Sequence, residues 1–213
     1  MARVGRARTR LNLANLTGAD ADATLVPAAY ARVAAYSIAE PRRENRVFNA
    51  SITARDISVA PAYRNLTVGS PAVPDTFRVK VVDAARNGQD GVTRQWDQLK
   101  YTAKTSGINI ASYTEARLIM AEAAGGVSAI AILNALRTGR GMPQLTAAEQ
   151  ADVPGTVVEE RRRWLFSEGQ RYNDMLRKGI PFPTGVNHKN QTYGNITCLP
   201  LPDVETLNNP NLQ

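Results

Sequence analysis

The chain has 213 residues, of which 43% are hydrophobic and 21% are charged. This composition excludes a chain that is disordered throughout, and the length allows one domain, or two small ones, with a sizeable core. The net charge of +7 would suit an anionic partner such as nucleic acid, so the place of the charges along the chain matters.

Side chains that usually carry catalysis or bind metals are scarce. Cys198 is the only cysteine and His188 the only histidine. This excludes an intramolecular disulfide and a zinc site built from several cysteines, and it leaves little material for a Ser/His/Asp triad. No glycine-rich phosphate loop or other enzymatic motif is present. We therefore expect no catalytic residue, no metal, no cofactor and no enzyme activity.

The basic N-terminal stretch is interpreted as a helix. MARVGRARTRLNLANL superficially resembles a targeting peptide, but it lacks a continuous apolar core and a small-residue cleavage site. Its apolar residues recur three or four positions apart, at Val4, Ala7, Leu11 and Ala14. Nowhere does the sequence contain 18 consecutive apolar residues, so it predicts no membrane-spanning helix.

A second helix is predicted to follow at once, so that residues 1–40 would form a helical hairpin. Thr17 can cap this helix, Asp20 would occupy its third position, and the helix would extend over residues 19–37. Two helices joined by a glycine-containing turn are typical of a tetratricopeptide-like hairpin, although any helical bundle supplies one.

Between residues 41 and 110 the pattern changes to short β-rich runs separated by Pro, Gly, Asn and Asp. We expect long irregular loops and one or two β-hairpins in this region. Loops of this length either bind a ligand or cover the helices, and the sequence leaves both readings open. The aromatic residues expected on loops are Tyr63, Trp96, Tyr101 and Tyr193.

Helical periodicity returns over residues 111–180. Ala116, Ile119 and Ala123 mark one helix, which the glycine pair at 125–126 ends, and residues 127–143 form the second arm of a hairpin.

Beyond this hairpin the sequence predicts a connector, a helix and a tail. Residues 143–156 are rich in turn formers and predict the connector. The pattern after Val157 predicts an amphipathic helix. Residues 181–213 are rich in Pro and Asn and predict an extended C-terminal tail.

Residues 159–179 combine six basic and four acidic side chains. Interleaved charges favour ion pairs within the protein over phosphate binding. On a helix, Glu168, Arg171, Asp174 and Arg177 would form successive contacts three residues apart. We interpret the stretch as an internal brace whose charged groups clamp backbone carbonyls or a neighbouring helix. Paired catalytic carboxylates for glycoside cleavage are disfavoured, because each carboxylate has a nearby arginine that lowers its pKa.

Four segments, in order, resemble a known family: YTEARLIMAEA, LNALRTGRGMP, EERRRWLFSEGQRYNDMLRKGIPFP and CLPLPDVETLNNPNL. They are similar to the C-terminal portion of the RagB/SusD family, which shows Leu-Asn-x-x-Arg, then Glu-Arg ahead of Glu-Gly-x-Arg-x-x-Asp, then Leu-Pro-x-Pro-x-x-Glu. The matching positions, called the signature residues below, are Glu115, Glu122, Asn134, Arg137, Glu160, Arg161, Glu168, Gly169, Arg171 and Asp174. Leu133, Pro200, Pro202 and Glu205 also match.

The resemblance implies a mainly α fold of tetratricopeptide-like helical hairpins with long irregular loops and a few short β-strands. It implies one partial domain over residues 1–213. Family members are usually longer and begin with a secretion signal and a lipid-bearing cysteine, so we expect a truncated chain without that anchor. Trp164 stands where the family usually has a glutamate, and we expect it to be buried against the preceding hairpin in place of a salt bridge.

The function implied by the resemblance is non-catalytic capture of a nutrient on the external face of the bacterial outer membrane. The ligand would be an oligosaccharide or other polymer fragment, and the partner a SusC-like, TonB-dependent transporter. The motifs identify no ligand-binding residue. Two other classes remain open: a helical-repeat adaptor that binds another protein, and a nucleic-acid binder through Arg3, Arg6, Arg8 and Arg10, which the interleaved charges disfavour.

Overall fold

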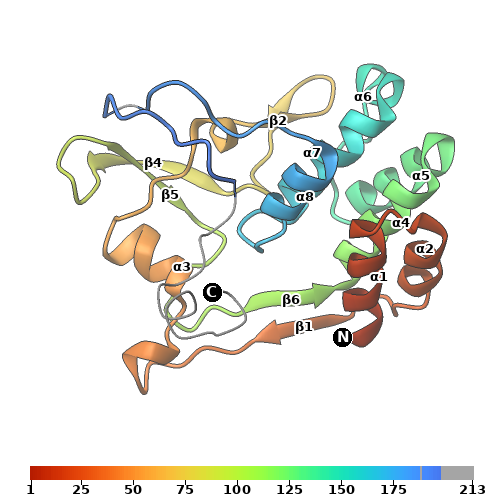
Figure 1. Cartoon of the computed structure of the whole chain (residues 1–213), viewed down its shortest axis with the longest axis horizontal. Helices are drawn as coiled ribbons and strands as arrows, with labels where there is room; N and C mark the ends of the chain where they lie inside the picture. The colour runs from red at the N-terminus through yellow and green to blue at the C-terminus, as the bar shows by residue number, and fades with distance from the viewer. Residues whose placement is uncertain (188, 198–213) are drawn as a thin grey trace, which may run out of the picture.

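The computed structural model describes residues 1–187 and 189–197. Helices from both ends of the chain pack together on one side of the molecule, and short antiparallel strands with their loops lie on the other (Figure 1). A mainly α fold with a few short strands was expected and is confirmed.

The N-terminal hairpin is shorter than the sequence predicts. It consists of α1 (Ala2–Asn12) and α2 (Leu16–Thr24). Val4, Ala7 and Leu11 are buried along one stripe of α1, as expected, but Ala14 does not belong to this stripe, because α1 ends at Asn12 and Ala14 is exposed with a left-handed φ of 58°.

The second helix of this hairpin differs from its prediction in both its cap and its end. Asn15, not Thr17, caps α2, and its Oδ1 accepts a hydrogen bond from the Gly18 amide at 2.9 Å. The helix does not continue to residue 37, because Pro27 disfavours a helical conformation in the residue before it and Ala29 has a left-handed φ of 62°. A strand, β1 (Ala31–Ala34), follows instead.

The middle of the chain contains loops and β-hairpins, as predicted, together with single helical turns that the pattern of short β-rich runs does not predict. Its helical turns are η1 (Pro41–Arg43), α3 (Arg46–Phe48), the π-helical η2 (Asn49–Thr53) and η3 (Pro61–Tyr63). Its hairpins are β2 (Thr67–Val68) with β3 (Val73–Pro74), and β4 (Val81–Asn87) with β5 (Arg94–Gln98). A third pair joins β1 to the distant β6 (Ile108–Ser112), with Ala31 opposite Ser112.

The second helical group begins where β6 ends. It consists of α4 (Tyr113–Ala124), α5 (Gly126–Thr138), α6 (Ala147–Ala151), α7 (Val153–Trp164) and α8 (Arg171–Lys178). The α4–α5 hairpin agrees with the sequence prediction. The expected connector instead contains α6, whose start is fixed by a reciprocal capping box between Thr146 and Glu149.

The charged stretch forms two helices and not one. Helix α7 ends at Trp164 and α8 begins at Arg171, because Ser167 and Gly169 between them have left-handed φ angles of 58° and 77°. Glu168 therefore lies outside both helices, and the predicted contacts of Glu168 and Asp174 with Arg171 are wrong. The predicted contact between Asp174 and Arg177 is confirmed, at 2.6 Å.

Helix α4 is the centre of the helical side, since it contacts α1, α2, α5 and α7. One face packs into a core with α1 and α2 through Ala116 and Ile119. The opposite face packs against α5 and α7 through Leu118 and Ala121. A smaller core of Val59, Val79 and Phe166 lies beneath the loops. No helix in the described part of the chain is long and apolar enough to cross a membrane.

Candidate functional site

The N-terminal arginines are engaged with carboxylates of neighbouring helices. Arg6 and Arg10 both pair with the buried Asp22 of α2, at 2.5 and 2.9 Å. Arg8 donates from Nε and Nη2 to the two carboxylate oxygens of Glu115, at 2.6 and 2.8 Å. Glu115 itself lies in the first turn of α4 and is only 3% exposed. The Arg6 and Arg10 pairs hold α1 against α2, and the Arg8–Glu115 pair joins α1 to α4 of the second helical group, so these arginines act in helix packing.

A second group of signature residues joins α4 to α7 and α8. Arg161 of α7 donates two hydrogen bonds to the carboxylate of Asp174 in α8, both at 3.0 Å. Glu122 at the end of α4 accepts from Arg177, and Lys178 lies 2.6 Å from the same carboxylate. Burial alone would raise the pKa of Glu122, but the hydrogen bonds from Arg177 and Lys178 outweigh it and hold that pKa below its usual value.

The third group holds the end of α5. Asn134 accepts a hydrogen bond from the Leu145 amide at 2.8 Å. Arg137, which is 1% exposed, donates from Nη2 to Glu149 at 2.5 Å and to Glu160 at 2.7 Å. The two signature residues of the Leu-Asn-x-x-Arg motif thus fasten the turn after α5 to α6 and α7.

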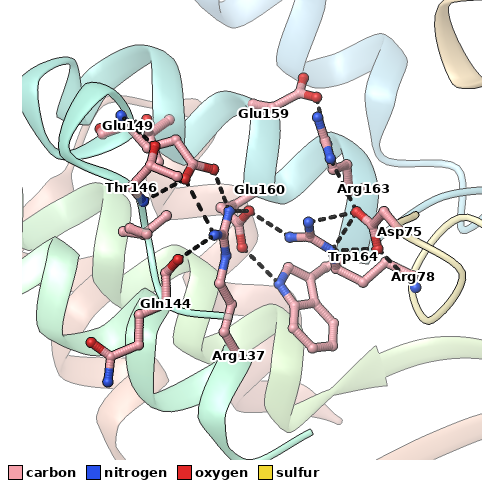
Figure 2. Close-up of polar contacts among 12 residues, drawn as sticks. Asp75, Arg78, Arg137, Gln144, Thr146, Glu149, Glu159, Glu160, Arg163 and Trp164 are labelled. Carbon is pink, nitrogen blue, oxygen red and sulfur yellow. Dashed lines mark hydrogen bonds and ion pairs between the residues drawn. The ribbon is translucent and has the colours of Figure 1, made fainter. Parts of the chain in front are cut away.

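Glu160 of α7 accepts hydrogen bonds from three side chains that lie in different parts of the sequence (Figure 2). Its Oε1 accepts from Arg137 and, at 2.5 Å, from Nη1 of Arg78. Its Oε2 accepts from the indole Nε1 of Trp164 at 3.0 Å. The guanidinium of Arg78 is also held by Asp75, whose Oδ2 accepts from Nη2 at 2.6 Å.

Two further arginines of α7 extend this network to the loops. Arg163 bridges Glu159 and Asp75, and its Nη1 donates to the Thr67 carbonyl at 2.7 Å. Arg162 pairs with Glu159 and donates to the Ala62 carbonyl at 2.6 Å. The charges of α7 therefore clamp backbone carbonyls in residues 62–67 and a buried aspartate, which is the brace that the interleaved charges indicate.

Glu168, Gly169 and Arg171 occupy the turn between α7 and α8. Glu168 accepts from Lys100 at 2.7 Å and from Asn109 at 3.2 Å, so it ties this turn to the β5–β6 region. Gly169 has a φ of 77°, a conformation that glycine adopts at little cost. Arg171 begins α8, and its Nη1 has no acceptor among residues 1–187 and 189–197.

Trp164 is buried, with 8% of its surface exposed, and packs in the core formed by the α4–α5 hairpin and α7. This confirms the expectation from the sequence. Its ring also contacts Phe77 edge-on, with the ring centroids 5.8 Å apart, and the Arg78 guanidinium lies over it.

The carboxylates of this network suit bracing better than acid catalysis. Burial raises the pKa of Glu159, but hydrogen bonds from Arg162 and Arg163 more than reverse this and lower it. Burial likewise raises the pKa of Asp75, but the hydrogen bonds and charges of Arg78 and Arg163 outweigh burial and lower that pKa. A general acid requires the opposite shift. In the described ranges, no three His, Cys, Asp or Glu side chains are grouped so that they could hold a metal ion.

An open cleft of about 1010 Å³ lies on the loop side of the molecule. We call it the loop cleft. It is bounded by residues 55–64, by the end of the β4–β5 hairpin and by residues 189–193. Figure 1 shows the chain after α8 running back over this hairpin. The charged residues that line the cleft are Arg55, Asp56, Arg64, Asp90, Arg94 and Lys189.

The four loop aromatics have different environments. Tyr193 lines the loop cleft and is 44% exposed. Trp96 is partly buried, and the Arg64 guanidinium lies 5.0 Å from its ring centroid. Tyr101 is buried and donates from its hydroxyl to the Ser167 carbonyl, and Tyr63 packs against Phe166. Only Tyr193 of these four is thus placed as an exposed platform in the cleft.

Several partners of the signature residues escaped sequence reasoning. Arg8, Asp75, Arg78 and Lys100 are far from the signature motifs in the sequence, and their spacing carries no periodic signal apart from the three-residue step between Asp75 and Arg78. The expected roles of His188, Cys198, Pro200, Pro202 and Glu205 fall on positions outside the described residues.

Comparisons with known proteins agree with this architecture. A solved structure of a SusD-like carbohydrate-binding protein from Bacteroides vulgatus is similar, with a TM-score of 0.63 and 17% sequence identity. The match covers 99% of this chain and 58% of that chain, so this chain spans little more than half the length of that relative. The comparison with curated proteins gave no match. The family model of the SusD family matches residues 89–213, more than half of the sequence. The chain therefore belongs to the SusD family.

Proposed function

We propose that the protein is a non-catalytic saccharide-binding subunit, and that the loop cleft is where it takes its ligand. The observation that carries the proposal is the cleft itself, together with membership of the SusD family. Small-molecule sites usually have volumes of about 300–1,000 Å³, so a cleft of about 1010 Å³ has room for several sugar rings.

The lining of the cleft has the chemistry that a saccharide requires. Sugar rings present an apolar face that stacks on aromatic rings, and Tyr193 offers such a ring with 44% of its surface exposed. Sugar hydroxyls both donate and accept hydrogen bonds, and the lining supplies the Gln89 side-chain amide and the Asp56 carboxylate alongside the arginines. The description of the Bacteroides vulgatus relative as carbohydrate-binding supports the same ligand class.

The remaining parts of the proposal concern place and partner. A SusD-family subunit would act on the external face of the bacterial outer membrane and pass its ligand to a SusC-like, TonB-dependent transporter. We assign contact with the transporter to the helical side, because the residues that line the cleft all belong to the loop side. Co-expression of the protein with a SusC-like transporter should co-purify the two proteins, and separate elution of the two would contradict this part of the proposal.

The binding proposal is tested by calorimetric titration with a panel of soluble oligosaccharides, comparing the protein with Tyr193→Ala. Loss of the stacking ring should weaken binding ~10-fold, because removal of an aromatic platform costs about 1–2 kcal/mol. Tyr172→Ala is the matched control, since Tyr172 is 45% exposed but lies on α8 and does not line the cleft. Equal weakening by both variants would contradict the assignment of the cleft. Absence of saccharide binding together with binding of a peptide by the helical hairpins would favour the adaptor function.

A further inference from the structure

The loop cleft contains more positive than negative charge after its internal ion pairs are counted. Lys189 pairs with Asp90 at 2.5 Å. This pair joins the chain after α8 to the turn between β4 and β5. Asp90 also accepts hydrogen bonds from the Val92 and Thr93 amides, and the contacts with Lys189 and Thr93 lower its pKa. Asp90 is therefore ionised and neutralises Lys189.

Arg94 is also neutralised. Its side chain pairs with Asp83 on the adjacent strand, with Nε and Oδ1 2.8 Å apart. The hydrogen bond from Arg94 is the main cause of a lowered pKa at Asp83, to which the nearby charge of Arg64 contributes. Two of the four cations that line the cleft thus have an anionic partner in place.

Arg64 is positioned by contacts that leave its charge uncompensated by an ion pair. Its Nε donates to the Val59 carbonyl at 2.8 Å, and its guanidinium lies over the Trp96 ring. Both contacts are with uncharged groups. A guanidinium held through its Nε and through one face keeps its two terminal amino groups for an acceptor that offers two oxygens, such as a carboxylate or a sulfate.

Arg55 is the second cation of this kind. It is exposed, lines the same cleft, and forms no ion pair with any residue in the described ranges. Its backbone is fixed, because the Arg55 carbonyl accepts from the Gln89 amide at 3.1 Å and so joins residue 55 to the hairpin. Asp56 is the remaining carboxylate of the lining and can accept hydrogen bonds from sugar hydroxyls.

We propose that the loop cleft selects anionic saccharides, whose carboxylate or sulfate groups bind Arg64 and Arg55 while a ring stacks on Tyr193. This inference rests on the proposed saccharide-binding function and names its ligand class. A neutral saccharide would leave both guanidinium groups without an anion, so each acidic residue of a glycan adds a charge-assisted contact that its neutral counterpart lacks.

The test compares chemically matched pairs of glycans: polygalacturonate with its carboxyl-reduced form, and chondroitin sulfate with desulfated chondroitin. Affinities are measured by calorimetry or affinity electrophoresis with the full chain. We expect the acidic member of at least one pair to bind ~10-fold or more tightly than its less charged form, and the difference to shrink as salt is raised from ~0.05 to ~0.5 M.

Variants distinguish specific binding by the two cleft arginines from non-specific attraction of an anionic glycan to the positive net charge of the protein. Arg64→Gln and Arg55→Gln should each reduce the acidic preference ~3-fold, so that the two together account for the ~10-fold difference, and should leave binding of the neutral, carboxyl-reduced glycan unchanged. Arg55→Gln keeps the test valid if loss of the Arg64–Trp96 contact disturbs the loop. Arg32→Gln removes the same charge from β1, outside the cleft, and should bind like the parent protein. Polyglutamate, a polyanion without sugar rings, should bind weakly, and its affinity should be the same for the parent protein and for Tyr193→Ala.

The outcomes distinguish this inference from the proposed function. Equal affinity for both members of every pair, with no effect of the arginine variants, would overturn the acidic preference and leave saccharide binding standing. Equal effects of Arg32→Gln and Arg55→Gln, or polyglutamate binding as tight as that of the acidic glycans, would attribute the preference to net charge and overturn the inference. Failure to bind any glycan would overturn both proposals.

Discussion

Arg78, in the loop before β4, and Glu160, in α7, form an ion pair in which the two side chains are 0% and 1% exposed. Their contact of 2.5 Å joins the loop region to the helical side, because Arg78 is also held by Asp75 and Glu160 by Arg137 and Trp164 (Figure 2). Desolvation of two charges is unfavourable, so the pair depends on this complete set of hydrogen bonds.

Replacement of Glu160 by glutamine should destabilise the protein strongly. The amide keeps the shape of the side chain but removes its negative charge, so that Arg137 stays buried with Glu149 as its remaining anion and Arg78 with Asp75. Breaking a buried pair on one side typically costs about 3–5 kcal/mol of unfolding free energy. Urea denaturation followed by circular dichroism measures the loss.

The neighbouring Glu159→Gln provides the control for this experiment. Glu159 pairs with Arg162 and Arg163, but its side chain is 37% exposed. An exposed pair contributes about 0–1 kcal/mol, so a loss much smaller than that of Glu160→Gln is expected. Similar losses for the two variants would show that burial of the Arg78–Glu160 pair is not what matters.

Trp164 should contribute to stability through both its ring and its indole N–H. Trp164→Ala removes a buried ring from the α4, α5 and α7 core and should cost about 3–5 kcal/mol. Trp164→Phe keeps most of the packing but deletes the donor to Oε2 of Glu160, for which about 1–3 kcal/mol is expected. Thermal and urea unfolding of the two variants measure these losses. A Trp164→Phe variant as stable as the parent would show that the hydrogen bond to Glu160 is dispensable.

The helices that the sequence predicts correctly are those with a regular periodic pattern, to which α4 adds clear signals at both of its ends. Helix α4 has Ser112 as its cap and a glycine pair after it, and α1 has a regular stripe of buried residues. The second helix was predicted too long, since the alanine-rich residues after Pro27 fit a helical pattern while pairing with β6 makes them a strand. That pairing joins residues far apart in the sequence, which local patterns do not encode.

Some residues of the candidate sites could also be predicted from local sequence patterns, and others could not. The signature residues could be located by their spacing, and the interleaved charges of α7 indicated pairing within the protein. Their partners Arg78 and Asp75 could not be found, because a loop residue acquires its partner only through the fold. The loop cleft was equally hidden, since Arg55, Arg64 and Tyr193 come from three separate segments.

Stability should fall at acidic pH because several partly buried carboxylates have lowered pKa values. In Glu122, Glu149 and Glu159, hydrogen bonds from basic neighbours outweigh the effect of burial and hold the folded-state pKa below the ordinary 4.5. The unfolded chain then binds more protons than the folded one below pH 4.5, so the stabilisation is complete above that pH and is lost as the pH falls through the folded-state values.

Urea denaturation at a series of pH values tests this dependence. The unfolding free energy should be nearly constant from pH 7 to about 5.5 and decline below about 4.5. In Glu122→Gln the decline should be shallower, because one of the contributing groups no longer titrates, and the stability at pH 7 should be lower than that of the parent. Identical slopes for the parent and this variant would exclude Glu122 as a contributor.

Arg8 should matter for folding, and nucleic-acid binding should be absent. Because Glu115 is 3% exposed and accepts two hydrogen bonds from Arg8, Arg8→Ala would leave a buried carboxylate without its cation and should destabilise the protein by about 2–4 kcal/mol. Arg3→Ala is the matched control, since Arg3 donates to the Leu25 carbonyl at an exposed position, and a loss below about 1 kcal/mol is expected.

Filter binding of DNA and RNA by the parent protein should show no salt-dependent affinity, because Arg6, Arg8 and Arg10 already face carboxylates. Salt-dependent binding that Arg3→Ala and Arg8→Ala both abolish would overturn this assignment of the N-terminal charge to helix packing.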